Sequence, residues 1–433
     1  MNRRVVTLQA LILAVFVSIL VLLTASTALA KTTLRFWIHE HPPEVNYIKE
    51  VLIPEFVKKH PDVNIEFSYF PHKDYTQKIM VAMATGTAPD FFDLGDWFYP
   101  TFTAKSLLDP VPSQAFGYKN LDALLKDYIP HSLDGLMDEG KLYGIPIQLN
   151  SFSLYINTAH FREAGLDPDK DAPKTWDDLV RVAQKLVKTE NARITREGFD
   201  FPYNGPVWAM YTFDPLIRQF GGSILSADGK KATINSPAGV AALTMWRDLA
   251  YKYKVADPNL SVATGAVPNQ DFTIGKVSMW TTGPWALEQI KANAEVYKDT
   301  VVAPIPQHDP AHPVTLLYGF AWTVNAKTTP DKKKLAWEFI AMAADRPTEW
   351  LLKLGFPQPR IRWYESAEAK KFPFLDTFIG DMARGHYLTR SVYFNEISQS
   401  VDRAIQRCLF NGMDPKESLD IAAREIDNVL QGK

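Results

Sequence analysis

The chain has a single cysteine, Cys408, among its 433 residues, and it carries almost no net charge. One thiol cannot form an internal disulfide, and it cannot build a zinc or iron–sulfur site that needs several cysteine ligands. Lysine and arginine total 47 against 49 aspartate and glutamate residues, so a nucleic acid or an anionic membrane surface finds little charge to hold. The composition therefore predicts neither of these as a partner.

Long hydrophobic runs are also scarce, and the one that could span a bilayer is the stretch Val5–Leu23. Arg3 and Arg4 precede it, and Ala28–Ala30 places small residues at the two positions that signal peptidase reads. We expect a signal peptide over the first 30 residues, cleavage before Lys31, and a protein released into the periplasm. The alternative is an uncleaved membrane anchor, because the stretch is long for a signal core. Lipid attachment is excluded, since the cysteine lies near the other end of the chain.

Aromatic residues are what this sequence has in excess, with 11 Trp, 17 Tyr and 25 Phe. A hydrophobic content of 46% with 22% charged residues is typical of a folded globular protein. The aromatic content exceeds what a core of this size needs. We therefore expect some of these rings to face a ligand.

The part of the chain after the signal alternates between short apolar strands and amphipathic helices. This alternation predicts an α/β sheet protein. Helix starts are indicated at Thr175–Asp178, which has the spacing of a capping box, and at Ser236 and Thr329, each followed by proline. The first expected elements are strands at residues 33–38, 63–70, 90–94 and 152–156, and helices at 45–59 and 75–85.

Short motifs follow one another in a fixed order along this part of the chain. They are Gly86–Phe92, Tyr143–Pro146, Leu154–Asn157, Ala164–Pro168, Thr175–Leu179, Phe220–Gly222, Gly275–Met279, Gly283–Trp285 and Ala336–Ile340. Each motif is weak alone, but the ordered set behind an export signal resembles the family 1 extracellular solute-binding proteins of ABC importers. That group includes the maltose-binding proteins, and the resemblance covers nearly the whole mature chain.

The resemblance implies the type II periplasmic binding protein fold, an α/β fold in which three crossovers join two lobes. Placed by motif, the crossovers fall near residues 149–153, 302–305 and 320–322. The expected lobes are residues 31–149 with 304–320 for lobe one, and residues 150–303 with 321–433 for lobe two.

The resemblance also implies a soluble receptor that closes over a small carbohydrate, either a sugar, an oligosaccharide or a polyol. Such a receptor delivers its ligand to the transmembrane permease subunits of an ABC importer. We expect a monomer with no cofactor, no metal and no catalytic residue.

In similar sugar receptors the loop after the first strand supplies hydrogen-bonding side chains, and here that loop holds Glu40 and His41. The next such loop holds Asp96 and Trp97, an acceptor beside a ring that can cover the C–H face of a sugar. The alternative for Trp97 is a core residue under the loop. A metal site is the rival interpretation of the histidines, namely His39, His41, His60 and His72. His39 is equally well explained as a solvated loop residue.

The remaining expected contacts come from the crossovers and from lobe two. Asn150 and Ser151 lie at the first crossover, and Tyr318, Gly319 and Phe320 at the third, where glycine lets the backbone approach a ligand. From lobe two we expect Trp208, Tyr211, Trp280 and Trp285, although Trp208 and Tyr211 also fit one turn of a core helix. Among these the family's stacking tryptophan corresponds to Trp285.

Arg360 follows the segment Gly355–Pro359 and could reach the same site from the C-terminal part of the chain. Its alternative role is a surface arginine that pairs with an acid. Two further functions stay open at this point. A secreted glycoside hydrolase would need two carboxylates across a groove, which Glu40 and Asp96 could supply. A receptor for a solute other than sugar is the second.

Overall fold

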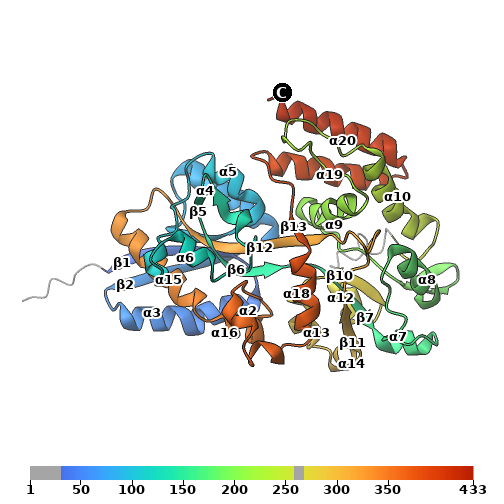
Figure 1. Cartoon of the computed structure of the whole chain (residues 1–433), viewed down its shortest axis with the longest axis horizontal. Helices are drawn as coiled ribbons and strands as arrows, with labels where there is room; N and C mark the ends of the chain where they lie inside the picture. Colours follow the sequence, from blue (N-terminus) through green and yellow to red (C-terminus); the bar gives the residue numbers. More distant parts are fainter. Residues whose placement is uncertain (1–30, 258–267, 433) are drawn as a thin grey trace, which may run out of the picture.

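The computed structural model describes residues 31–257 and 268–432 and contains two main β-sheets, each covered by its own helices (Figure 1). We call the larger sheet with its helices lobe one and the smaller sheet with its helices lobe two. Lobe one lies on the left of Figure 1 and lobe two on the right. The predicted signal peptide lies outside the described residues. Within them, no helix is long and apolar enough to cross a membrane.

The sheet of lobe one has six strands and is mixed. Its strands follow the order β13-β12-β3-β1-β2, and β6 also pairs with β12. Strand β1 is parallel to β2 and β3, whereas β12 is antiparallel to both β3 and β6. The bounds are β1 (Thr32–His39), β2 (Val63–Phe70), β3 (Phe91–Gly95), β6 (Ile145–Asn150), β12 (Thr315–Val324) and β13 (Gly385–Tyr387).

The strand sequences explain this arrangement. In β1, Leu34, Phe36 and Ile38 are fully buried and alternate with the partly exposed Arg35 and Trp37. Strand β3 is buried at every residue, as expected of an inner strand covered on both faces. Because β1 and β3 are parallel, the loops after their carboxyl ends lie at the same edge of the sheet.

The helices of lobe one cover both faces of its sheet. On one face, the Phe36 ring stacks on Phe91 at 4.2 Å and meets Trp322 edge-on at 4.8 Å and Phe339 of α15 at 5.7 Å. The helices are α2 (Pro42–Tyr47), α3 (Ile53–Lys59), α4 (His72–Thr85), α5 (Tyr99–Thr103), α6 (Leu121–Leu125), α15 (Pro330–Ala344) and α16 (Pro347–Leu354).

The sheet of lobe two has three antiparallel strands in the order β10-β7-β11. Their bounds are β7 (Ser153–Asn157), β10 (Met279–Thr282) and β11 (Thr300–Ala303). Two short hairpins pair β4 (Met137–Asp138) with β5 (Lys141–Leu142) and β8 (Lys188–Glu190) with β9 (Arg193–Arg196). The first strands expected from the sequence, at residues 33, 63, 90 and 152, are confirmed within one residue at each end.

Helices of lobe two surround its sheet, and α19 and α20 stack beside α9 and α10 at the top of Figure 1. The capping box at Thr175 is confirmed, and the Ser236 side chain caps its helix as predicted. Thr329 precedes its helix but makes no capping hydrogen bond with its side chain. The helices are α7 (Thr158–Glu163), α8 (Trp176–Leu186), α9 (Pro206–Gln219), α10 (Pro237–Tyr251), α12 (Pro268–Thr273), α13 (Ala286–Ile290), α14 (Ala294–Lys298), α18 (Leu375–Ala383), α19 (Phe394–Leu409) and α20 (Pro415–Leu430).

The chain crosses between the lobes from β6 to β7, and again from β11 to β12. The crossover expected at residues 320–322 is wrong, because these residues lie inside β12. There Trp322 pairs with Asp93 of β3 on one side and with Ile145 of β6 on the other. A strand bonded on both edges continues its sheet, so residues 321–354 stay with lobe one and not with lobe two. The chain leaves lobe one later, near α17 (Ile361–Tyr364).

Candidate functional site

Aromatic side chains from both lobes meet where the lobes touch. Trp97 follows β3, while Tyr318 and Phe320 lie on β12, and all three belong to lobe one. Helix α9 of lobe two contacts β12 and brings Tyr211 against these rings. We call the following set the aromatic cluster: Trp97, Phe152, Trp208, Tyr211, Trp285, Tyr318 and Phe320.

The rings of the aromatic cluster form one continuous series of contacts. The Tyr211 ring lies 4.4 Å from Tyr318 and 5.5 Å from Trp97, in the latter case edge to face. On the other side of the cluster the Trp285 indole Nε1 donates a hydrogen bond of 2.9 Å to the Tyr318 hydroxyl. Trp208 lies 6.1 Å from Trp285 and 5.6 Å from Tyr211. The lobes therefore meet through rings, which suit the apolar face of an amphipathic ligand.

Several buried polar atoms beside these rings have no hydrogen-bond partner in the structure. They are Asp96 Oδ1, Trp97 Nε1, Asn150 Oδ1 and Tyr211 Oη. Asn150 shows how this arises, since its Nδ2 donates to Gln148 Oε1 at 2.9 Å and leaves its own oxygen unpaired. Buried polar groups in proteins are nearly always paired, so this concentration indicates a site that is completed by another molecule.

Asp96 is the acid nearest to the aromatic cluster. Burial raises its pKa to about 8, although the charge of Arg390 and the backbone N–H groups of Trp97 and Gly319 act in the opposite direction. Its carboxyl group therefore holds a proton near neutral pH. A protonated carboxyl both donates and accepts hydrogen bonds, which is the pattern that a hydroxyl group of a ligand also presents.

The structure thus brings Asp96, Trp97, Asn150, Trp208, Tyr211, Trp285, Tyr318 and Phe320 together. Ser151 is buried next to them at the first crossover, and its hydroxyl donates to the Phe152 carbonyl. His41 lies against Phe356 at 4.6 Å, with its buried Nδ1 unpaired. Glu40 is exposed at the start of α2. Phe152 was not among the expected contacts, and only its place directly after Ser151 signals it.

Contrary to expectation, Trp280 lies outside the aromatic cluster. Its side chain is fully buried in the core of lobe two, with Tyr155 and Phe272 each 5.9 Å away. Side chains alternate across a strand, and β10 turns Trp280 toward α12 and α13. Trp285 lies beyond the end of β10 and is free of that constraint.

Arg360, also expected at the site, is paired with other groups of lobe one. It is 5% exposed, and its Nε donates to Asp127 Oδ2 at 2.8 Å. The other guanidinium nitrogens donate to the Ala344 carbonyl at 3.0 Å and to the Tyr118 hydroxyl at 2.8 Å. Its donors are therefore taken up by lobe one, and the alternative of an acid partner is correct, although Arg360 itself is buried rather than on the surface.

Gly319 is required for packing against the adjacent strand. A Cβ at this position would lie 2.4 Å from the Gln148 carbonyl oxygen in the adjacent strand β6. We expect Gly319→Ala to lower the free energy of unfolding by about 1–3 kcal/mol, since backbone must move to admit the methyl group. Urea denaturation measures this change.

Gly380→Ala in α18 is the matched control, because a Cβ there meets nothing within 4 Å. We expect it to be neutral or stabilising, as alanine favours a helix by about 1 kcal/mol over glycine. Equal destabilisation by both variants would contradict the packing role of Gly319.

His39, at the end of β1, is buried and pairs with Asp93 rather than lying in a solvated loop. Burial lowers the pKa of His39, but the charge and hydrogen bond of Asp93 outweigh this and hold it above the usual value. The His39 ring packs on Phe320 at 4.2 Å. Over residues 31–257 and 268–432, no group of three or more His, Cys, Asp or Glu side chains is placed to hold a metal ion.

Glu44 was not expected at the site, and it lies buried beside this pair. Its Oε2 has no hydrogen-bond partner, and the residue is 1% exposed. Burial raises its pKa to about 8, Asp93 adds to the rise, and the charge of His39 opposes it. The sequence offered no signal for this, because Glu44 reads as a first-turn acid of a surface helix.

Because its pKa is raised, Glu44 should make the free energy of unfolding depend on pH. The folded protein binds this proton more tightly than the unfolded chain, so the contribution of Glu44 is full below pH 4.5 and is lost as the pH rises to about 8. Glu44→Gln removes this loss, so we expect the variant to gain about 1–3 kcal/mol over the wild type between pH 5 and pH 8. Urea denaturation at both pH values measures the gain.

The exposed Glu40 supplies the control for this measurement. We expect Glu40→Gln to follow the wild type at both pH values. A constant difference between Glu44→Gln and the wild type would show that Glu44 is ionised throughout and would contradict the prediction.

Comparison with known proteins agrees with this architecture. The sequence matches the bacterial extracellular solute-binding protein family over residues 41–349. It is 30% identical over 429 residues to the sn-glycerol-3-phosphate-binding periplasmic protein UgpB of Escherichia coli strain K12, covering 93% of this chain and 94% of the relative. A putative binding protein of Brucella abortus is 24% identical over 411 residues, with 92% and 93% covered.

Among solved structures, an ABC transporter solute-binding protein from Thermotoga lettingae bound with α-D-tagatose matches with a TM-score of 0.78 and 25% identity. The match covers 92% of this chain and 100% of that one. Maltose-bound MalE3 from T. maritima matches with a TM-score of 0.81 and 21% identity, with the same coverage, and shows the fold. The two lobes are those of a type II periplasmic binding protein. The chain belongs to the bacterial extracellular solute-binding protein family.

Proposed function

We propose that this chain is the substrate-binding receptor of an ABC importer and that it captures a small carbohydrate, either a sugar, an oligosaccharide or a polyol. The observation that carries this proposal is the aromatic cluster with its unpaired buried polar atoms. Rings cover the C–H face of a sugar, while Asp96 and Asn150 can meet its hydroxyl groups. Such a site can contact both the apolar face and the hydroxyl groups of an amphipathic ligand.

The proposed contacts are divided between the lobes, and this division gives the receptor a reason to close. A ligand gains its full set of contacts only when the lobes meet, so it binds the closed form more tightly and shifts the population toward it. The proposed contacts are His41, Asp96, Trp97, Asn150, Ser151, Trp208, Tyr211, Trp285, Tyr318 and Phe320.

The aromatic rings at the site favour a neutral ligand over a phosphate ester. Arg360, the arginine expected there, is committed to Asp127. One relative in the comparison binds sn-glycerol 3-phosphate, whereas the T. lettingae protein holds a sugar. The chemistry of the aromatic cluster agrees better with the sugar.

The proposal includes the cellular setting expected from the sequence. The chain acts as a monomer in the periplasm after cleavage at Ala30, and it hands its ligand unchanged to the permease without catalysis or nucleic acid. The family supports this setting, because its members and structural neighbours are binding proteins.

A thermal-shift screen over sugars, polyols and sn-glycerol 3-phosphate tests the proposal. A ligand at 100 times its dissociation constant should stabilise the protein by about 2.7 kcal/mol. We expect a neutral sugar or polyol to give the largest shift and to be recovered intact by chromatography. A shift by the phosphate ester alone would contradict the ligand class, and turnover of the sugar would favour the hydrolase.

A further inference from the structure

One buried carboxylate contacts two of the segments that link the lobes, the first and the second crossover. Asp381 lies on α18 and is fully buried. Its Oδ2 accepts a hydrogen bond of 2.5 Å from the Ser153 hydroxyl at the first crossover, and one of 3.4 Å from the Ile305 backbone N–H at the second. Its backbone carbonyl accepts a hydrogen bond from the Thr315 hydroxyl at the start of β12.

The neighbours of Asp381 complete this junction. Arg384 donates to Asp381 Oδ1, and the Arg384 carbonyl accepts the backbone N–H of Thr315 at 3.1 Å. Helix α18 itself packs on both β7 and β12, so it lies between the two sheets, as Figure 1 shows. The side-chain bonds therefore join segments that are far apart in the sequence but adjacent at the lobe boundary.

We propose that Asp381 is the positioning residue that couples the crossovers and holds them in the geometry in which the lobes meet. Each crossover could otherwise bend independently. With one carboxylate bound to Ser153 and Ile305, and its own backbone bound to Thr315, a rotation at one crossover must disturb the others. Hydrogen bonds to a charged group are stronger than neutral ones, so an ionised Asp381 suits this task.

The protonation state of Asp381 gives a second way to perturb the same junction. Burial raises its pKa to about 6, while the Ser153 hydrogen bond, the charge of Arg384 and the Ile305 N–H oppose the rise. The groups that face it are Arg384 from the end of its own helix, Ser153 from β7, Ile305 after β11 and Thr315 from β12. Acidification below pH 6 therefore removes the charge that these donors bind.

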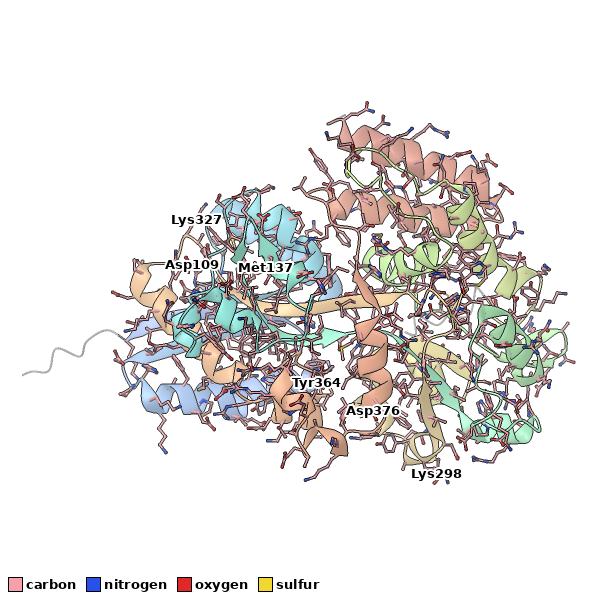
Figure 2. The ribbon with its side chains drawn as sticks, in the orientation of Figure 1. Asp109, Met137, Lys298, Lys327, Tyr364 and Asp376 are labelled. Carbon is pink, nitrogen blue, oxygen red and sulfur yellow. The ribbon has the colours of Figure 1, made fainter. Side chains whose placement is uncertain are left out.

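The test measures the distance between the lobes without any ligand, so it does not depend on the proposed function. Spin labels on Lys298→Cys in lobe two and Lys327→Cys in lobe one, both exposed positions labelled in Figure 2, report this distance, because the native Cys408 is buried. We expect Asp381→Asn to lower the ratio of short to long distances about tenfold at pH 7.5. Asp376→Asn, an exposed acid on the same helix, should leave the ratio unchanged.

Two further measurements separate a coupling role from simple stabilisation. In the wild type the ratio should fall between pH 7.5 and pH 5, and in Asp381→Asn it should stay flat. Ser153→Ala removes the hydrogen bond from Ser153 to Asp381 and should lower the ratio of short to long distances by a smaller factor. This variant also keeps the test available if Asp381→Asn does not fold. An unchanged distance distribution in these variants, or a lowered melting temperature alone, would overturn the proposal.

Failure of the coupling proposal can be distinguished from failure of the proposed ligand class. Binding of a sugar in the thermal-shift screen, together with distance distributions that do not respond to Asp381→Asn, would leave the receptor intact and reject the coupling. A response of the distances to Asp381→Asn, together with no sugar or polyol binding in the thermal-shift screen, would support the coupling and reject the proposed ligand class.

Discussion

Trp97→Leu should weaken binding of the sugar that gives the largest thermal shift by about thirtyfold, which is about 2 kcal/mol. Trp97 contacts Tyr211 of the other lobe at 5.5 Å and Phe320 at 5.2 Å, and its buried indole Nε1 has no partner. The substitution keeps apolar bulk but removes both the flat ring and the N–H donor. Isothermal titration measures the loss.

Trp280→Leu is the matched control, because it changes the same residue type in the core of lobe two. We expect it to lower the melting temperature and to leave the affinity for the sugar unchanged. If Trp97→Leu instead left the affinity unchanged and lowered the melting temperature, Trp97 would be a core residue. The proposed site would then lose its central contact.

Arg360→Ala should lower the free energy of unfolding by about 3 kcal/mol without changing the affinity for the sugar. The substitution leaves the Asp127 carboxylate without its 2.8 Å partner and the buried Ala344 carbonyl without a donor. Breaking one half of a largely buried ion pair is costly because the other half keeps its charge. Urea denaturation followed by tryptophan fluorescence measures the change.

Arg362→Ala provides the comparison, since Arg362 approaches the same carboxylate from solvent. Its side chain is 59% exposed, and its Nε lies 3.6 Å from Asp127 Oδ1. An exposed pair of this kind contributes at most about 1 kcal/mol. A large loss of affinity in Arg360→Ala, with little loss of stability, would return Arg360 to the ligand site.

The sequence by itself determined the α/β class, the first strands and the capped helix starts. These features depend on residues that are neighbours in the chain, because the alternation of a strand and the hydrogen bonds of a cap span only a few positions. The ordered motifs determined the family for the same reason. The third crossover was misplaced because a glycine in an apolar run is equally compatible with a hinge and with a strand paired on both edges.

Only the tertiary structure decided which of the aromatic and charged residues face the site. Trp280 and Trp285 lie five positions apart and differ in their surroundings, because one points into the core of lobe two and the other contacts Tyr318. Asp381 reaches Ser153 over 228 positions and Ile305 over 76, separations at which no local pattern carries information. The burial that raises the pKa of Glu44 likewise comes from packing around it, which depends on how distant segments come together.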